Sequence, residues 1–256
     1  AREGLLAMNV RHLEQFQPVC PACRTEESAS HVKVTGVDKE AGEHIIEGRL
    51  GCSNAACQHE YPIIDGIPIL LPAVRDYVSD NLLSILGRTD LSGATESMIG
   101  DCCGPNSPFH HLRLHLSSYA SSHYGTFDAE AGDAKEGDAC GDHSTMAVLQ
   151  ASLDAAGTTT GPIIDVGCAV GGTTFALAEQ TGDLVLGIDV HFSMLRVASQ
   201  VLQDGVVQYP RRRGGIVYDR RSFDITCAGR ERVDFWACDA TALPFPRGAF
   251  STAVGL

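Results

Sequence analysis

The chain has 256 residues, of which 44% are hydrophobic, enough for one large hydrophobic core or two modest ones. This composition excludes fibrous and wholly disordered proteins, and no apolar run reaches the ~18 residues that a membrane span needs. The net charge of −13 argues against a general nucleic-acid binder, because phosphate contacts need clustered Lys and Arg. Nucleic acid therefore stays possible only through a local basic patch.

The N-terminal segment, residues 1–16, carries apolar residues at a spacing that predicts a short amphipathic helix. It lacks the charged and then apolar form of a signal peptide. The ten cysteines of the chain are unevenly spaced, which fits a reducing compartment better than a disulfide scaffold. We therefore expect a soluble, cytoplasmic protein that does not enter membranes.

Two cysteine pairs follow this helix: Cys20-Pro-Ala-Cys23 and Cys52-Ser-Asn-Ala-Ala-Cys57. Four thiolates close a tetrahedron around zinc and leave no open position, which is the arrangement of a structural site. His59 is the alternative fourth ligand. A redox pair of Cys20 and Cys23 and unpaired core cysteines are the other interpretations, and the ligand number and spacing favour zinc.

Short antiparallel strands are predicted between and after the cysteine pairs, at 31–35 and 44–50, with a hairpin over 60–72 that bends at Asp65-Gly66. Cys-Pro-x-Cys, a second cysteine pair and Tyr-Pro-Ile-x-Asp-Gly-Ile-Pro-x-Leu-Leu together resemble the small zinc-ribbon protein that activates several tRNA and protein methyltransferases. The resemblance covers residues 15–73. It implies a stabilising or partner-binding role for the ribbon, with no chemistry of its own.

In the next segment, the spacing of apolar residues predicts helices at 78–86 and 108–119. A group of histidines in and after the second helix invites a metal hypothesis: His110, His111, His115 and His123. No Asp or Glu lies at the sequence spacing that a metal-binding motif would require. We therefore favour histidines that lie on the surface or pack in the core. Residues 126–143 are acidic and small, which predicts a solvated linker. A lid is the alternative, with 118–125 as the part that would touch a ligand.

From residue 144 onward, helices and strands alternate. Ser144 can cap a helix that ends at Gly157. Strands are predicted at 162–166, 184–188, 233–237 and 250–256, with helices at 173–180 and 194–202. Alternation with short connections predicts a parallel sheet with right-handed crossovers.

A buried strand runs directly into a glycine-rich turn and a helix between Pro162 and Gly172. Gly167 can adopt a backbone conformation closed to other residues, and Gly171 lets a ligand approach the first amides of the helix. An NAD site would use Gly-x-Gly-x-x-Gly, whereas Ala169 and Val170 follow Cys168 here, so the turn argues against a diphosphate.

Three carboxylates stand at the carboxyl ends of successive strands, where open parallel sheets bind ligands. S-adenosylmethionine offers a donor group to each of them. Asp165 can hold the ammonium side, Asp189 the ribose diol and Asp239 the adenine amino group. The helix start near Gly171 can receive the carboxylate of the ligand.

The segments Asp165-Val-Gly-Cys-Ala-Val-Gly-Gly172, Gly187-Ile-Asp-Val190 and Cys238-Asp-Ala-Thr-Ala-Leu-Pro-Phe245 resemble the first three motifs of class I S-adenosylmethionine-dependent methyltransferases. Ala169 departs from the glycine of many members. The resemblance implies methyl transfer from S-adenosylmethionine to an unidentified acceptor. The candidate cofactor-binding residues are Asp165, Gly167, Cys168, Ala169, Gly171, Asp189, Val190, Asp239 and Ala240.

Seven arginines lie between the last predicted helix and the third strand: Arg211, Arg212, Arg213, Arg220, Arg221, Arg230 and Arg232. They could hold phosphate or an acidic substrate. A solvated loop, partly neutralised by neighbouring acids, is the alternative.

The predicted fold is α/β: a Rossmann-like class I methyltransferase sheet of about four strands, preceded by a small β-rich zinc ribbon. Its segments are a ribbon with a leading helix (1–75), a helical segment and acidic linker (76–143), and a cofactor-binding half (144–256). We expect a fragment of a longer enzyme that lacks the substrate half, so no catalytic residue is named, and we expect its fourth strand to form an apolar edge that promotes self-association. The alternatives are a non-catalytic binding module with a cofactor-sensing or inert scaffold, and a nicotinamide dehydrogenase.

Overall fold

The computed structural model describes residues 7–25, 28–87, 89, 91–128, 145–157 and 159–256. The predicted linker falls outside these residues from position 129 onward, as does Ser144 with its predicted cap. The N-terminal segment begins with strand β1 (Met8–Asn9), and helix α1 (Val10–Phe16) follows directly. The described part of the predicted helix is therefore shorter than expected, because it starts only where the Asn9 side chain caps it.

The ribbon consists of strands β2 (Val32–Ala41), β3 (His44–Cys52), β4 (Glu60–Ile64) and β5 (Ile67–Leu70), paired antiparallel in chain order. Asp65 and Gly66 form the bend between β4 and β5 with φ values of 53° and 75°. Positive φ at both central residues is what a two-residue type I′ turn requires. The predicted hairpin is therefore confirmed.

Helices α2 (Val74–Asp80) and α3 (Leu82–Leu86) replace the single helix predicted over 78–86, because Asn81 between them has a non-helical backbone. Helix α4 (Gly93–Cys103), which Ser92 caps, was not predicted. Helix α5 (Pro108–Tyr124) extends beyond its predicted end and leads into the short 3-10 helix η1 (Gly125–Phe127). None of the helices described here is both long and apolar enough to cross a membrane.

The α/β part follows the predicted alternation closely. Its elements are α6 (Thr145–Ala156), β6 (Ile163–Val166), α7 (Gly172–Thr181), β7 (Val185–Asp189), α8 (Phe192–Asp204), β10 (Val233–Cys238) and β11 (Thr252–Gly255). Gly157 ends α6 with φ of 78°, and its amide donates to the carbonyl of Leu153. These four strands pair in parallel, as the alternation predicted.

Ribbon strands and parallel strands belong to one sheet, in the order β1-β3-β4-β5-β10-β7-β6-β11, with β2 paired to β3. Strand β5 lies parallel to β10, with Ile69 beside Ala237 and Leu70 beside Cys238. All four residues of β5 are buried, which is typical of a strand covered on both faces. Segments 1–75 and 144–256 therefore share a sheet, which the sequence did not predict.

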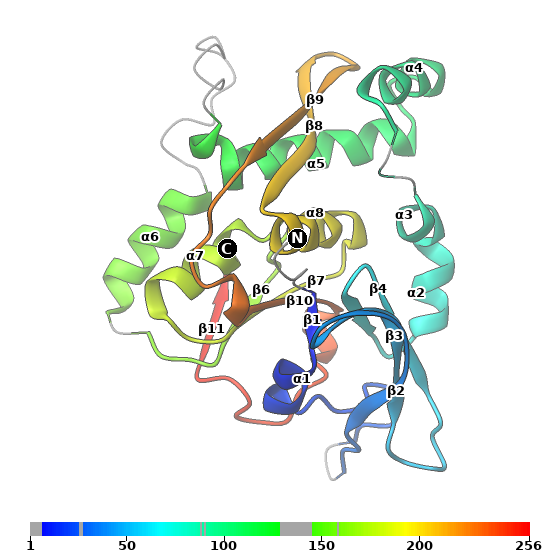
Figure 1. The fold of residues 1–256 in the computed structure, drawn as a ribbon, viewed down its shortest axis with the longest axis vertical. Helices are drawn as coiled ribbons and strands as arrows, with labels where there is room; N and C mark the ends of the chain where they lie inside the picture. The colour runs from blue at the N-terminus through cyan, green and yellow to red at the C-terminus, as the bar shows by residue number, and fades with distance from the viewer. Residues whose placement is uncertain (1–6, 26–27, 88, 90, 129–144, 158) are drawn as a thin grey trace.

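Helices cover both faces of this sheet (Figure 1). Helices α7 and α8 lie on one face, where Phe235 packs against Phe175 with ring centres 5.3 Å apart. Helix α1 lies on the other, where Trp236 meets Phe16 at 5.6 Å. The buried Asp234 carboxylate fastens α1 to β10, because its Oδ2 lies 2.5 Å from Nδ1 of His12.

Five of the seven arginines of this insert lie in a β-hairpin, which corrects the interpretation as a solvated loop, and Arg230 and Arg232 lie in the short 3-10 helix η3 (Arg230–Arg232). Strands β8 (Val206–Gly214) and β9 (Val217–Asp224) pair antiparallel and form a separate two-stranded sheet. The hairpin and α5 make a further layer above α8 (Figure 1). The register places Arg211 directly opposite Asp219, so opposite charges pair across the strands and stabilise the hairpin.

Candidate functional site

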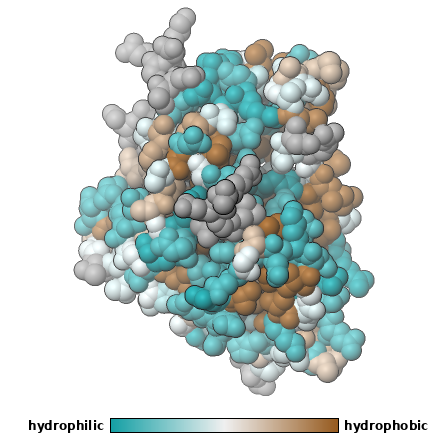
Figure 2. All heavy atoms as spheres, viewed as in Figure 1, coloured by the Kyte–Doolittle hydropathy of each residue, from teal (hydrophilic) through white to brown (hydrophobic). Residues whose placement is uncertain are grey.

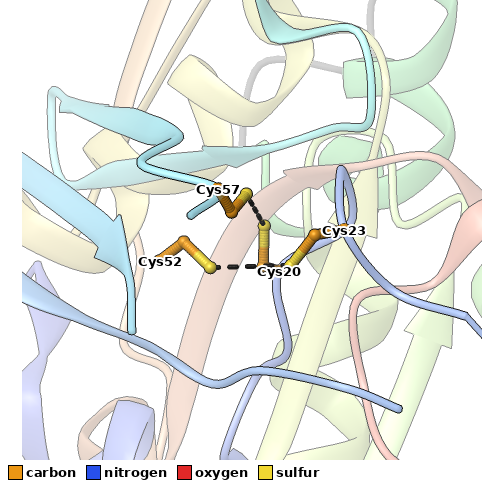
Figure 3. A group of neighbouring side chains, drawn as sticks. All are labelled: Cys20, Cys23, Cys52 and Cys57. Atoms are coloured by element: carbon orange, nitrogen blue, oxygen red, sulfur yellow. Dashed lines mark hydrogen bonds between the residues drawn. The ribbon is translucent and has the colours of Figure 1, made fainter. Parts of the chain in front are cut away.

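The four predicted cysteine ligands come together at the base of the ribbon (Figure 3). Their Sγ atoms all lie within 4.8 Å of one another, at 3.7 Å for Cys20 to Cys57 and 3.6 Å for Cys23 to Cys52. Sulfurs bound at 2.3 Å to one tetrahedral ion lie roughly 3.8 Å apart. The thiols are therefore spaced for a single metal ion, and among the described residues they are the only such cluster.

Two aromatic residues complete the surroundings of the thiols. The hydroxyl of the buried Tyr61 lies 3.1 Å from Sγ of Cys20. His59 places Nδ1 3.3 Å from Sγ of Cys57 and stacks on Tyr61, so it lies beside the four thiols. Burial acts to raise the pKa of the Cys20 thiol, but hydrogen bonds from Tyr61 and two backbone amides leave it below its ordinary value.

The cysteine turn also contacts the loop that follows β10. The amide of Val19 donates to the carbonyl of Pro244 at 2.8 Å, and the guanidinium of Arg24 donates to the carbonyl of Leu243. This loop begins at Asp239, one of the predicted ligand contacts. The turn that carries Cys20 and Cys23 therefore contacts one side of the predicted ligand-binding edge.

The glycine turn lies between β6 and α7 at the carboxyl edge of the parallel strands. Gly167, Ala169 and Gly171 have φ values of 78°, 48° and 86°. A side chain at Gly171 would collide with the ring of Phe235, so that glycine is needed for packing. A Cβ at Gly167 would meet no atom within 4 Å, so the space above this residue is open to a ligand. No side chain caps the start of α7.

Asp165 is buried beneath this turn rather than exposed at it. Its Oδ2 accepts hydrogen bonds from the hydroxyls of Thr173 and Thr174, both at 2.7 Å. Burial raises the pKa of the carboxyl group, and the two threonine hydroxyls oppose the shift. In the structure Asp165 joins β6 to the first turn of α7, and its predicted contact with an ammonium group stays a prediction.

Asp189 ends β7 next to the glycine turn. Its Oδ2 accepts the amide of Ala169 at 3.0 Å, and its Oδ1 accepts the amide of His191 at 2.8 Å. Each carboxylate oxygen can accept a second hydrogen bond, so the group can still receive a diol. The register pairs Asp189 with Ala237 on β10, which brings it beside the strand that leads to Asp239.

Asp239 caps the short 3-10 helix η4 (Ala240–Ala242). Its Oδ1 accepts from both the hydroxyl and the amide of Thr241, at 2.7 and 2.8 Å, and these bonds lower the pKa of the carboxyl group. The other oxygen, Oδ2, is in none of these bonds. Val190 and Ala240, also predicted, are exposed at the ends of β7 and β10. The buried Cys168 points its thiol into the protein interior and offers only backbone atoms to a ligand.

Tyr77 is a residue of this edge that the sequence did not indicate. From α2, its hydroxyl donates to the carbonyl of Val190 at 2.7 Å. Burial and the nearby charge of Asp189 raise the pKa of the Tyr77 phenol to about 12, so it stays protonated and keeps donating at neutral pH. A helix attached to the ribbon thus fastens the residue that follows Asp189.

Replacing Tyr77 by Phe should remove one hydrogen bond and retain the ring. We expect a loss of about 1 kcal/mol in the free energy of unfolding and a several-fold weaker affinity for an adenosyl ligand, because the loop after β7 becomes less ordered. Denaturant unfolding and calorimetry measure the two effects. Tyr119→Phe, at an exposed position on α5, is the matched control, and equal effects of both variants would contradict this role for Tyr77.

The histidines of α5 do not form a cluster. His111 and His115 are exposed, and His110 faces Tyr218 of the hairpin, with 3.4 Å between Nδ1 and the hydroxyl. His123 is buried against Gly172 at the start of α7, and burial lowers the pKa of its imidazole to about 4. The neighbouring Tyr124 hydroxyl donates to the carbonyl of Val170 at 2.6 Å, so the end of α5 contacts the glycine turn.

Comparison of the chain with protein-family models and with curated proteins found no match. The chemistry of the residues is therefore the basis for assigning a role. At one edge of the sheet the structure combines an open glycine turn, an uncapped helix start and two partly engaged carboxylates. This arrangement can bind a polar ligand that carries hydroxyl and amino donors.

Proposed function

We propose that this protein binds S-adenosylmethionine at the carboxyl edge of its parallel strands and is part of a methyltransferase. The observation that carries the proposal is the strand order β10-β7-β6-β11, the third, second, first and fourth parallel strands of the α/β part. This 3-2-1-4 order places a topological switch point between β6 and β11, where doubly wound sheets bind nucleotide ligands. The glycine turn follows β6 at that point.

The residues present fit the nucleoside end of the ligand best. Asp189 would receive the ribose hydroxyls on the lone pairs that Ala169 and His191 leave unused, and Oδ2 of Asp239 would receive the adenine amino group. Gly167 leaves room for the ligand to approach the backbone. Asp165 would act by holding Thr173 and Thr174, and thereby the start of α7, in place.

Zinc is the ion that we propose for the four cysteines, since tetrahedral thiolate sites with no open position are typical of structural zinc. Binding requires all four thiols to lose their protons. The ion would hold the turn of Cys20 and Cys23 against Leu243 and Pro244 and so support the adenine side of the proposed site.

S-adenosylmethionine, when bound, supplies a methyl group on a sulfonium for in-line displacement by an acceptor nucleophile. The chain's contribution to such a reaction is chiefly alignment, because fixing the position of a reactant can remove a large part of the barrier. The glycine turn, Asp189 and Asp239 would fix the nucleoside.

Titration calorimetry with S-adenosylmethionine, with its demethylated product and with NAD tests this proposal. We expect the two adenosyl ligands to bind with one site per chain and NAD to show no binding heat. Binding of NAD alone would overturn the proposal in favour of a dehydrogenase. Binding of none of the three, by a zinc-loaded and cooperatively melting protein, would favour a non-catalytic module.

A further inference from the structure

The end of helix α5 lies in a corner beside the glycine turn, where three consecutive residues contact different elements. The hydroxyl of Ser122 lies 2.7 Å from the hydroxyl of the first residue of α6. His123 packs against Gly172, the first residue of α7. Tyr124 donates its hydroxyl to the carbonyl of Val170 in the glycine turn. Because successive helical residues point about 100° apart, these contacts enclose the end of α5 on most of its sides.

His123 occupies the middle of this corner. The residue is only 3% exposed. A Cβ on Gly172 would lie 2.7 Å from Cβ and 2.9 Å from Nδ1 of His123, so the imidazole fits because α7 starts with a glycine. Nδ1 is buried and has no hydrogen-bond partner in the part of the chain that the structure describes. The imidazole is therefore held against the start of α7 by packing.

Protonation of His123 is incompatible with this packing. A neutral imidazole carries one N–H, whereas an imidazolium carries two. The added proton would bring a charge into the buried corner and would place an N–H without an acceptor at Nδ1. Burial accordingly lowers the pKa of His123 to about 4.

The other titratable side chains of the corner are neutral. Cys168 of the glycine turn and Cys227 of the loop after β9 lie near Tyr124. Burial raises the pKa of all three groups, so they keep their protons at neutral and mildly acidic pH. None of them changes its charge in the range in which a histidine titrates.

The charged groups of the neighbouring segments do not compensate a protonated His123. Asp165 lies beneath the glycine turn and accepts two threonine hydroxyls. Asp128, which follows η1, pairs with Arg221 of the hairpin. Burial is the cause of the lowered pKa of His123, and neither pair of contacts opposes it. A proton on this imidazole therefore has no countercharge close to it.

We propose that His123 is a positioning residue, whose neutral imidazole holds the end of α5 against the glycine turn and whose protonation releases it. Release would break the bond from Tyr124 to Val170 and remove the packing on Gly172. The docked helix disfavours the proton, so docking is strongest above the ordinary histidine pKa of about 6.5 and weakens as the pH falls from there. A lower affinity for an adenosyl ligand would follow, and this consequence rests on the proposed function.

Hydrogen exchange of the protein without an adenosyl ligand tests the release. Protection factors of the amides at 118–124 should fall about tenfold between pH 7.5 and pH 5.5, because the released histidine takes up a proton in this range. Protection factors already divide out the intrinsic effect of pH on exchange. His123→Phe, which keeps a buried ring but cannot titrate, should abolish the fall, whereas His115→Phe at an exposed position of α5 should retain it.

Both variants keep Asp165 and the four thiols, so the effects of acid on those groups are common to all three proteins. The difference between the unmodified protein and His123→Phe therefore isolates the titration of His123. An equal fall in protection in the His123 variant would overturn the proposal.

Nitrogen-15 spectra of the imidazole rings in the unmodified protein give a test that needs no variant. We expect the ring of His123 to remain neutral at pH 5.5 while the end of α5 is still protected from exchange. Protonation of this ring at about pH 6.5 without any loss of protection would overturn the proposal. The measurement decides the question even if replacement of His123 prevents folding.

The coupling to the ligand is tested by repeating the exchange measurement with saturating S-adenosylmethionine. Bound ligand should raise the protection of 118–124 at pH 5.5, because it binds better when the glycine turn is supported. Unchanged protection with ligand bound would overturn the coupling. Absence of binding at pH 7.5 and at pH 5.5 would instead overturn the proposed function, and the two preceding measurements would still decide the role of His123.

Discussion

Removal of the metal proposed for the four cysteines should lower both the stability of the protein and its affinity for an adenosyl ligand. Structural zinc contributes an apparent binding free energy of about 10–16 kcal/mol, comparable to the whole stability of a domain. We expect a strong chelator, or Cys20→Ser, to lower the unfolding midpoint by roughly 10 °C or more, since 1 kcal/mol corresponds to about 2–4 °C at this size. Metal analysis should give about one zinc per chain before treatment.

The effect on ligand binding follows from contacts between the cysteine turn and the loop after β10. Without the metal, we expect the hydrogen bonds from Val19 to Pro244 and from Arg24 to Leu243 to be lost. We also expect strand β5, which pairs with β10, to become less ordered because the rest of the ribbon no longer holds it in place. We expect adenosyl affinity to fall by about tenfold or more, which corresponds to 1.4 kcal/mol. Cys103→Ser, at an exposed position of α4, is the matched control. Unchanged affinity in a metal-free protein that remains folded would contradict this coupling.

Replacement of Asp189 by Ala should weaken adenosyl binding about 10- to 150-fold. Hydrogen bonds to a charged group contribute about 1.5–3 kcal/mol, and the variant also leaves the amides of Ala169 and His191 without their acceptor. Asp189→Asn should have a smaller effect, because one oxygen remains to accept a hydrogen bond. Calorimetry with S-adenosylmethionine measures the affinities.

An exposed carboxylate controls for the loss of charge in this comparison. Asp204, the last residue of α8, is exposed and distant in sequence from the glycine turn. Asp204→Ala should leave affinity unchanged, and the melting curves of both variants should stay cooperative. If Asp189→Ala bound the ligand as tightly as Asp204→Ala, the ribose role of Asp189 would be wrong.

The fourth parallel strand, β11, was predicted to form an edge of the sheet. In the described residues it does so, since it pairs only with β6. It is less apolar than expected, because Ala253 and Gly255 are the exposed residues of the strand. Larger apolar side chains are exposed on α3 instead, where Leu83 and Leu86 are 88% and 71% exposed, and Figure 2 shows apolar residues along this side. The pattern of strands in the sequence therefore did not predict that the exposed apolar side chains lie on helix α3.

Elements with a strong local pattern were predicted well. The strands and helices of the α/β part were recognisable because apolar periodicity and glycine positions are properties of short segments. The arginine-rich hairpin was missed, because its charged residues conceal the alternation of a strand until the register pairs Arg211 with Asp219. The split at Asn81 and the added helix α4 were missed because short helices depend on their packing rather than on local pattern.

The sequence by itself determined the two cysteine pairs that could hold a metal ion, the hairpin bend at Asp65 and the turn at Gly167, since each depends on residue type at short spacing. Only the tertiary structure decided that β5 extends the parallel sheet, that Tyr77 reaches Val190 and that Arg24 holds Leu243. It also decided that Arg113 is buried and that its Nε and Nη2 have no hydrogen-bond partner in the part of the chain that the structure describes. These contacts join residues far apart in the chain, and their formation depends on the packing of whole elements, which no local pattern encodes.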